Sequence, residues 1–347
     1  MQAFLKKITD LINGLAILAL LICYAAPYIN PQSFWPVAFF GLTYKFWLLL
    51  NILLLLFWIS FKRKRWFYNA FVILIGFQFI TRNIQWNEKV KETPDFAIAS
   101  FNTHVQQIYD GGNTSKQIDD YLANNNVDIA ILIEWLNKKG NISFKTFPHQ
   151  QLARLNDKNN RHDYSIKAVS KHKIKNWDII KFNHTSGNLA AYFDIEIKGQ
   201  MVRLVAVHLQ SNGISSSDYH KMMELDVNDE DYRNYALKFI SRMRNSFDKR
   251  AVQTKLVKEA MADSPYPIIV LGDFNDTPQS YTYEQLRDGR QDAFIERGRG
   301  WGATFLKPFS LLRIDYILHD KELKCTDFNA TREIQSDHKL IKAGFKF

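Results

Sequence analysis

The sequence predicts an α/β domain with mixed β-sheet pairing, preceded by an apolar helical segment suited to a membrane. Long uncharged runs occupy much of the first 86 residues, short apolar runs of strand length recur after residue 95, and helix-like segments separate several of these runs. Two of the short runs, 189–197 and 201–207, are separated by only three residues. This spacing predicts a hairpin, so antiparallel pairing should accompany any parallel pairing.

The N-terminal segment, residues 1–86, contains three apolar runs, at 8–29, 37–61 and 66–84. A spanning helix needs roughly 20 apolar residues, so we expect a transmembrane anchor of three helices, of which the third is marginal in length. A cleaved signal peptide is one alternative, disfavoured because two more apolar runs follow the first. Helices buried in a soluble core are the other, and they would need polar stripes that the second run lacks.

The basic residues predict the orientation of this anchor. Lys6 and Lys7 precede the first run, and the cluster 62–65, Lys-Arg-Lys-Arg, separates the second run from the third. Under the positive-inside bias both groups are cytoplasmic. Three crossings satisfy both, so we expect an integral membrane protein whose remaining residues lie outside the cytoplasm.

The charge balance argues mildly against a strong non-specific nucleic-acid binder. The chain has 347 residues and a formal net charge of +10, from 45 basic and 35 acidic residues. Residues 1–86 hold eight basic residues and one acidic residue, which leaves 37 basic and 34 acidic residues, a net of +3, for the rest. The two cysteines, Cys23 and Cys325, lie far apart in the sequence and predict neither a disulfide nor a zinc site.

After a polar linker at 87–95, residues 96–347 are expected to form one domain. Helices are expected at 115–125, 247–262 and 278–287, and the polar segment 211–246 is expected to be an insertion loop with helical portions. The expected strands are 96–101, 127–133, 189–197, 201–207, 267–271, 314–318 and 341–346.

Polar residues that bind hard cations or transfer protons lie at or near the ends of six of these elements. They are Asn102, Glu134, His208, Asp273, Asn275, Asp315, Asp337 and His338. Each has an ordinary alternative, such as a turn residue, a solvated carboxylate or a hydrogen-bonded core histidine. Asp315 is the hardest to explain in that way, because it interrupts an apolar run and a buried carboxylate is costly unless it is paired or coordinated.

Taken together and in order, these segments resemble the endonuclease/exonuclease/phosphatase superfamily, in a membrane-anchored bacterial form. The resemblance covers about residues 95–347. The matching segments are Ser100-Phe-Asn102, Asp128-Ile-Ala-Ile-Leu-Ile-Glu134, Val207-His-Leu-Gln210, Gly272-Asp-Phe-Asn275, Ile314-Asp-Tyr-Ile317 and Ser336-Asp-His338. The resemblance implies a four-layer sandwich of two mixed sheets flanked by helices, and hydrolysis of phosphoesters with Mg²⁺ or Mn²⁺.

The resemblance also implies a role for each residue. Glu134 would be the principal metal ligand, helped by Asn102 and Asp337. Asp273 would orient or deprotonate the attacking water, and Asn275 would hold the phosphate or that water. His338, paired with Asp315, and His208 would be the two histidines that face the phosphate.

Three positions depart from the family pattern. Ile133 stands where the family often has Gln, and His104 makes a second metal position doubtful there. The segment 163–170 carries Ser and Lys where small or apolar residues are usual, and within it Tyr164 would line the pocket.

The sequence therefore predicts a membrane-anchored, divalent-metal-dependent hydrolase of phosphoesters, with phosphodiesters as the expected class. A nuclease acting on DNA or RNA outside the cytoplasm is one alternative. A non-catalytic membrane protein that uses the scaffold for binding is the other. The sequence does not identify the substrate or the oligomeric state.

Overall fold

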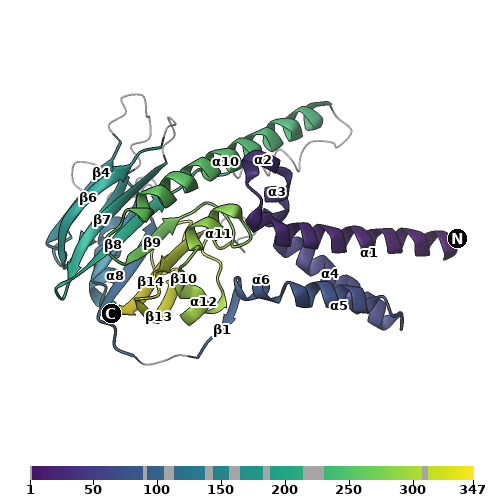
Figure 1. Ribbon diagram of the computed structural model, residues 1–347, viewed down its shortest axis with the longest axis horizontal. Helices are drawn as coiled ribbons and strands as arrows, with labels where there is room; N and C mark the ends of the chain where they lie inside the picture. Colours follow the sequence, from purple (N-terminus) through teal and green to yellow (C-terminus); the bar gives the residue numbers. More distant parts are fainter. Residues whose placement is uncertain are drawn as a thin grey trace.

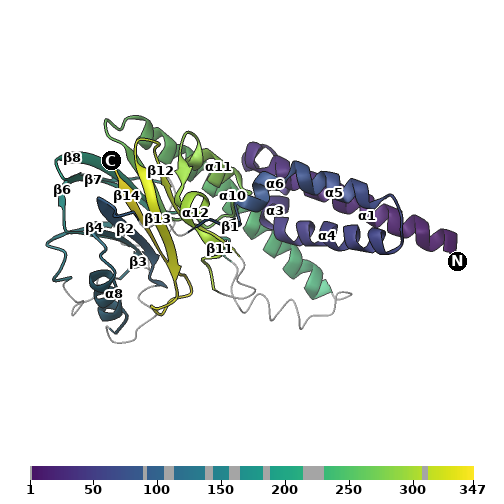
Figure 2. The same ribbon diagram turned by 90° about the horizontal axis from the view of Figure 1, so that it is seen from below.

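The computed structural model describes residues 2–88, 92–104, 113–136, 144–155, 165–182, 188–213, 230–306 and 312–347. Within these ranges a two-sheet sandwich lies at one end of the molecule, and a bundle of N-terminal helices extends away from it (Figures 1 and 2). Tyr164 and residues 214–229 of the expected insertion loop lie outside the described residues.

The first sheet has six strands in the order β13-β14-β2-β3-β5-β4. The strands are β2 (Phe96–Asn102), β3 (Ile129–Trp135), β4 (His149–Arg154), β5 (Ser165–Ser170), β13 (Lys324–Thr331) and β14 (Leu340–Lys346). β2 and β3 run parallel, and the other neighbours pair antiparallel. The central strand β2 is buried along its whole length, as expected for a strand covered on both faces.

The second sheet also has six strands, in the order β10-β12-β9-β8-β7-β6. The strands are β6 (Lys173–Ile180), β7 (Leu189–Ile197), β8 (Gln200–His208), β9 (Ile268–Asp273), β10 (Gln291–Asp292) and β12 (Asp315–His319). β8 and β9 are the parallel pair of this sheet, and β7–β8 is the hairpin that the sequence predicts. Both sheets are therefore mixed.

The two sheets pack face to face through one apolar cluster. Ile98 and Ile131 of the first sheet belong to the same buried cluster as Phe193, Leu204 and Leu271 of the second. Helices cover the outer faces and complete the four layers. α8 (Asn113–Asn124) packs on the first sheet, and α10 (Glu230–Ala262) and α11 (Tyr281–Arg287) pack on the second.

The N-terminal segment differs from the expected set of three spanning helices. Its elements are α1 (Gln2–Ala25), η1 (Ala26–Tyr28), α2 (Pro31–Phe34), α3 (Pro36–Leu42), α4 (Tyr44–Ser60), α5 (Trp66–Ile75) and α6 (Phe77–Thr81). Among the described residues, one helix, Lys7–Tyr28, is long and apolar enough to cross a membrane by itself. α3 and α4 meet this test only as a pair bent by 66°, and α5 is too short.

Local geometry accounts for both breaks. At Thr43, between α3 and α4, the backbone leaves the helical region, and its hydroxyl donates to the carbonyl of Phe39. Gly76 separates α5 from α6, where a Cβ atom would lie 2.0 Å from the ring of Tyr24. The prediction of three continuous helices was therefore wrong: the second run is bent and the third is interrupted.

The N-terminal helices are docked on the sandwich. β1 (Ile84–Trp86) pairs antiparallel with β11 (Arg299–Trp301), and Asn87 donates from Nδ2 to the carbonyl of Ile295 at 2.9 Å. The first residues of the expected linker are therefore held against the domain.

Candidate active site

The two parallel strand pairs bring four of the predicted side chains to one edge of the sandwich. Asn102 ends β2, Glu134 lies near the end of β3, and His208 and Asp273 are the last residues of β8 and β9. His208 and Asp273 are direct partners in the parallel register. Because parallel strands end at the same edge of a sheet, each sheet presents two polar side chains there.

Hydrogen bonds join these four residues across the two sheets. Asn102 donates from Nδ2 to Asp273 Oδ2 at 3.0 Å and to Glu134 Oε1 at 3.3 Å. His208 Nε2 lies 3.3 Å from the same Glu134 oxygen. All four are buried or nearly so, hence the site is rigid before any ligand arrives.

A second pair adjoins Asp273. Asp315, the first residue of β12, is the cross-strand partner of Asp273. Its Oδ2 lies 2.9 Å from His338 Nδ1, and His338 Nε2 lies 3.8 Å from Asp273 Oδ2. Asp273, Asp315 and His338 offer three ligand atoms within 4.8 Å of one another. Because His338 Nδ1 already bonds to Asp315, we interpret this group as a hydrogen-bonded Asp315–His338 pair beside Asp273.

Asn275 is fixed by the loop that follows β9. Its side chain donates to the carbonyl of Leu209 at 2.9 Å, and its backbone N–H donates to Asp273 Oδ1 at 2.8 Å. Leu209 directly follows His208 in the chain. The contact therefore ties the ends of β8 and β9 together.

Asp337 joins the site through His104, a residue that stands out in the sequence only as a departure from the family pattern. Asp337 Oδ2 lies 3.4 Å from His104 Nδ1, and Glu134 Oε2 lies 4.0 Å from the same nitrogen. Ser336 donates to the carbonyl of Asn102 at 2.8 Å, which holds this loop beside β2. All eight predicted residues thus belong to one region, with His104 between the two carboxylates.

Backbone strain is concentrated at this edge. Among the described residues, six that are not glycine have positive φ, and three of them are His104, Glu134 and Asn275. Such a conformation costs on the order of 1–3 kcal/mol and persists where the surroundings enforce it. Gly272 has φ +133°, and a Cβ there would lie 2.1 Å from the carbonyl oxygen of Val207. Two of the predicted site residues, Glu134 and Asn275, are therefore held in a strained backbone conformation.

Burial and neighbouring charges shift the pKa values of the acids and the histidine of the site in different directions. Burial alone would raise the pKa of Glu134, but the hydrogen bond and charge of His208 outweigh it and lower this pKa to about 2. Burial and the charge of Asp315 raise the pKa of Asp273 to about 6. Burial opposes protonation of His338, yet Asp315 and Asp273 raise its pKa to about 10. Near neutral pH the site therefore holds an ionised Glu134, a cationic His338 and an Asp273 that titrates.

A buried arginine from α10 braces the two loops that leave the site, which the sequence did not indicate. Arg250 donates from Nη1 to the carbonyl of Gln210 at 2.6 Å and from Nη2 to Asn212 Oδ1 at 2.8 Å. Its Nε donates to Asp276 Oδ2 at 3.1 Å. Arg250 is completely buried, so α10 holds the segments that follow both His208 and Asp273.

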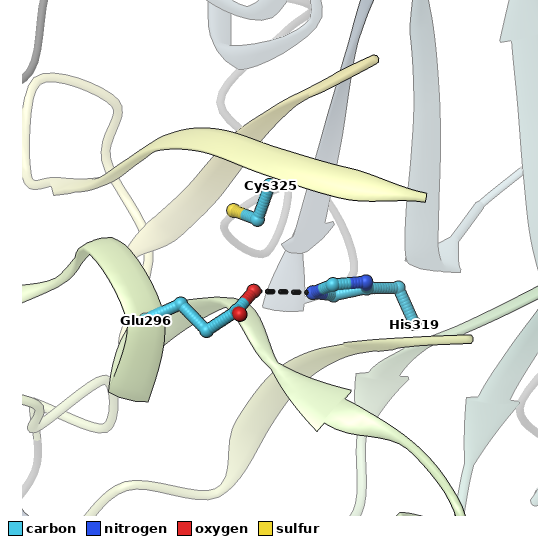
Figure 3. A group of neighbouring side chains, drawn as sticks. All are labelled: Glu296, His319 and Cys325. Carbon is cyan, nitrogen blue, oxygen red and sulfur yellow. Dashed lines mark hydrogen bonds and ion pairs between the residues drawn. The ribbon is translucent and has the colours of Figure 1, made fainter. Parts of the chain in front are cut away.

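A second cluster of ligand-type side chains is formed by Glu296, His319 and Cys325 (Figure 3). His319 Nε2 lies 2.8 Å from Glu296 Oε2, and Cys325 Sγ lies 3.5 Å from the carbonyl of Asp327. His319 ends β12, whereas Asp315 begins it, so the cluster lies away from the candidate active site. The hydrogen bond between His319 and Glu296 and the contact of the Cys325 thiol satisfy these side chains. We therefore interpret the cluster as structural.

Comparisons with known proteins agree with this geometry. Residues 99–338 match the sequence model of the endonuclease/exonuclease/phosphatase family. Residues 6–83 match a domain of unknown function, DUF8431. A search among curated proteins found no sequence match.

Several solved structures share the fold. The human nocturnin catalytic domain with bound sulfate anion is 14% identical, with a TM-score of 0.52, over 74% of this chain and 96% of that one. TDP2 from D. rerio, complexed with a single-strand DNA product, is 14% identical, with a TM-score of 0.52, over 73% and 99%. An endonuclease/exonuclease/phosphatase from Beutenbergia cavernae is 14% identical, with a TM-score of 0.52, over 74% and 72%. At this identity the likeness concerns the fold alone.

Proposed function

The chain belongs to the endonuclease/exonuclease/phosphatase family, and on this premise we propose that it is a membrane-anchored hydrolase of phosphodiesters that uses Mg²⁺ or Mn²⁺. The observation that carries the proposal is the connected network at the sandwich edge. Asn102 bonds to both Asp273 and Glu134, and His338 bonds to Asp315. The complete set of acidic, amide and imidazole groups favours an enzyme over a non-catalytic binding protein.

The oxygen ligands near His104 fit a divalent cation. Oxygens of Glu134 and Asp337 lie 4.0 Å and 3.4 Å from His104 Nδ1, and the low pKa of Glu134, about 2, keeps it ionised. Mg²⁺ retains several waters and needs only one or two carboxylates. Glu134 and Asp337, helped by Asn102, would hold the ion. When bound, it supplies positive charge that stabilises the negative oxygens of a phosphoryl group.

The remaining residues support hydrolysis. Asp273, with a pKa of about 6, accepts a proton from water near neutral pH. The water oxygen bonds to phosphorus, the ester P–O bond breaks, and the leaving oxygen takes up a proton from solvent, while Asp273 returns to solvent the proton that it accepted. The cationic His338 stabilises the charge on the phosphoryl oxygens, with Asp315 fixing its ring. Asn275 and His208 lie at the two adjoining strand ends, where they would contact the phosphate.

The N-terminal helices support a place in the membrane, and the catalytic domain would lie outside the cytoplasm if α5 and α6, interrupted at Gly76, together made a third crossing. Lys7–Tyr28 is long enough to span the bilayer, and the bent pair α3–α4 would provide a second crossing. Thr277, two residues after Asn275, donates to the carbonyl of Gly41 in α3 at 3.3 Å. The edge that carries the active site would therefore lie close to the bilayer.

The experiment uses the full chain in detergent or nanodiscs, with a chromogenic phosphodiester, a chromogenic monoester, single-stranded DNA and RNA as substrates. We expect hydrolysis of the diester that requires Mg²⁺ or Mn²⁺ and is abolished by EDTA. Asp273→Asn should lower kcat by at least about 100-fold, because the proton acceptor is lost. Preferred cleavage of DNA or RNA would favour the nuclease alternative.

Asp263→Asn is the matched control, because it removes an exposed carboxylate at the end of α10. Asp276 is unsuitable as a control, since it is buried and bonded to Arg250. If the folded, metal-loaded chain turned over no phosphoester in this set, the hydrolase proposal would fail and the binding alternative would be favoured.

A further inference from the structure

A cavity lies at the junction between the N-terminal helices and the sandwich. Its volume is about 230 Å³. Asn87 and Glu88, which follow β1, form part of its wall, together with Trp301 of β11. None of the eight residues of the candidate active site lines it, although Lys339 connects the two regions as the neighbour of His338.

The cavity is electropositive. Arg297, Arg299 and Lys339 line it, against the single carboxylate of Glu88. Arg297 donates from Nε to the carbonyl of Cys325 at 3.0 Å, and within the described part of the chain none of the three cations forms an ion pair. Gathered positive charge in a concave site attracts an anion, and paired guanidinium groups suit phosphate oxygens.

Three aromatic side chains also line the cavity. Phe294 and Phe328 lie edge to face, with their ring centroids 5.7 Å apart, and both line the cavity. Trp301, also in the wall, is 60% exposed. A free anion gains nothing from such a surface, whereas a ligand with a charged end and an apolar end uses both parts.

The cavity lies beside the ends of the apolar helices. β1 follows α6 after two residues and pairs with β11, and Figure 2 shows both strands next to the N-terminal helices. Trp86 is 69% exposed, and Lys45 of α4 lies 5.9 Å from the ring of Trp301. Tryptophans and lysines near the ends of spanning helices are typical of the membrane–water interface. The cavity is thus at the depth of lipid headgroups, if the membrane placement proposed above holds.

We propose that this cavity binds the headgroup of an anionic phospholipid from the bilayer in which the chain is anchored. Arg297, Arg299 and Lys339 contact the phosphate, and Trp301 lies against the glycerol and upper acyl region. The bound lipid would fix the height of the catalytic domain above the bilayer. The inference rests on the membrane placement but not on the hydrolytic activity.

The test measures lipid binding to the full chain in detergent by native mass spectrometry. The probes are phosphatidylglycerol, phosphatidylcholine and inorganic phosphate. We expect phosphatidylglycerol to bind at least about tenfold more tightly than phosphatidylcholine, and inorganic phosphate at millimolar concentration not to displace it. The double variant Arg297→Gln/Arg299→Gln should weaken phosphatidylglycerol binding by at least about tenfold.

Arg244→Gln/Lys255→Gln is the matched control, since it removes the same charge from exposed positions of α10. Melting temperatures establish that both double variants are folded. Equal binding of the two lipids, an equal loss in the control, or displacement of the lipid by inorganic phosphate would each overturn the proposal. Because the readout is retained lipid, the result is independent of any catalytic turnover.

Discussion

At the residue scale, the structure brings together the eight side chains that the sequence singles out, each of which follows, interrupts or shortly precedes an apolar run. It could not predict their contacts. Asn102 and Asp273 bond across two sheets although they are 171 positions apart. Arg250 was missed because its partners, Gln210 and Asp276, come from other elements. A single arginine in a polar helix carries no local signal of burial.

The pair of Asp315 and His338 leads to a prediction about pH. Burial lowers the pKa of His338, but the charge of Asp315 is the largest opposing influence and helps to raise this pKa to about 10. With Asp315→Asn that charge is lost, so the pKa of His338 should fall. If the rate requires cationic His338, the alkaline limb of kcat/KM should begin near pH 10 in the wild type and at lower pH in Asp315→Asn. A pH–rate profile with the chromogenic diester, recorded for the wild type and for Asp315→Asn, measures the alkaline limb of each.

The exposed substitution Asp288→Asn, after α11, serves as the control and should leave the alkaline limb unchanged. An identical alkaline limb in the wild type and Asp315→Asn would show that the charge of His338 does not govern the rate.

At the element scale, each of the seven expected strands is present, but β5 was missed although it is mostly buried, and so was the exposed β6. β6 was missed because it is an edge strand with mostly exposed side chains and therefore lacks an apolar run. β3 extends past the expected end at Ile133, and its pairing with β5 is irregular between Leu132 and Trp135. Glu134 lies within that irregularity. α10 begins at Glu230 instead of residue 247, because its first turns have few buried positions to produce an apolar stripe.

The close approach of β9 to β8 leads to a prediction about stability. Gly272 has positive φ, and a Cβ there would lie 2.1 Å from the backbone oxygen of Val207. Gly272→Ala should therefore lower the free energy of unfolding by about 3 kcal/mol or more, through backbone strain and displacement of the strand. Denaturant unfolding of the full chain in detergent measures this change.

Gly289→Ala separates the effect of backbone strain from the effect of the steric contact. Gly289 also has positive φ, at +78°, but nothing lies within 4 Å of the Cβ position. This substitution should lower the free energy of unfolding by only about 1 kcal/mol. Equal losses at both positions would mean that the contact with Val207 contributes nothing.

At the scale of the whole molecule, the four-layer sandwich followed from the family resemblance, but the docking of the N-terminal helices on it was not predictable. The sequence predicts a tether at residues 87–95, because that stretch is short and polar. In the structure the N-terminal helices contact the sandwich directly, through residues about 200 positions apart. Gln279, for example, donates to the carbonyl of Phe79. No local pattern encodes such a pairing.

Arg82 is the central residue of this junction. It is 3% exposed, its Nη1 donates to the carbonyl of Pro278 at 3.0 Å, and the same atom lies 2.8 Å from Glu284 Oε2. Its guanidinium also lies over the ring of Tyr283. One arginine from the N-terminal helices thus contacts the loop that follows Asp273 and the helix after it.

Arg82→Ala should therefore loosen the active-site loop as well as the junction. Breaking a buried ion pair typically costs about 3–5 kcal/mol, because the remaining charge is left unpaired. We expect a lower melting temperature and faster amide hydrogen exchange in residues 276–284, with unchanged exchange in β2 and β3. The exposed substitution Lys321→Ala is the control. Unchanged exchange in 276–284 would mean that the loop is held by the sandwich alone, and that the N-terminal helices do not contribute to the rigidity of the site.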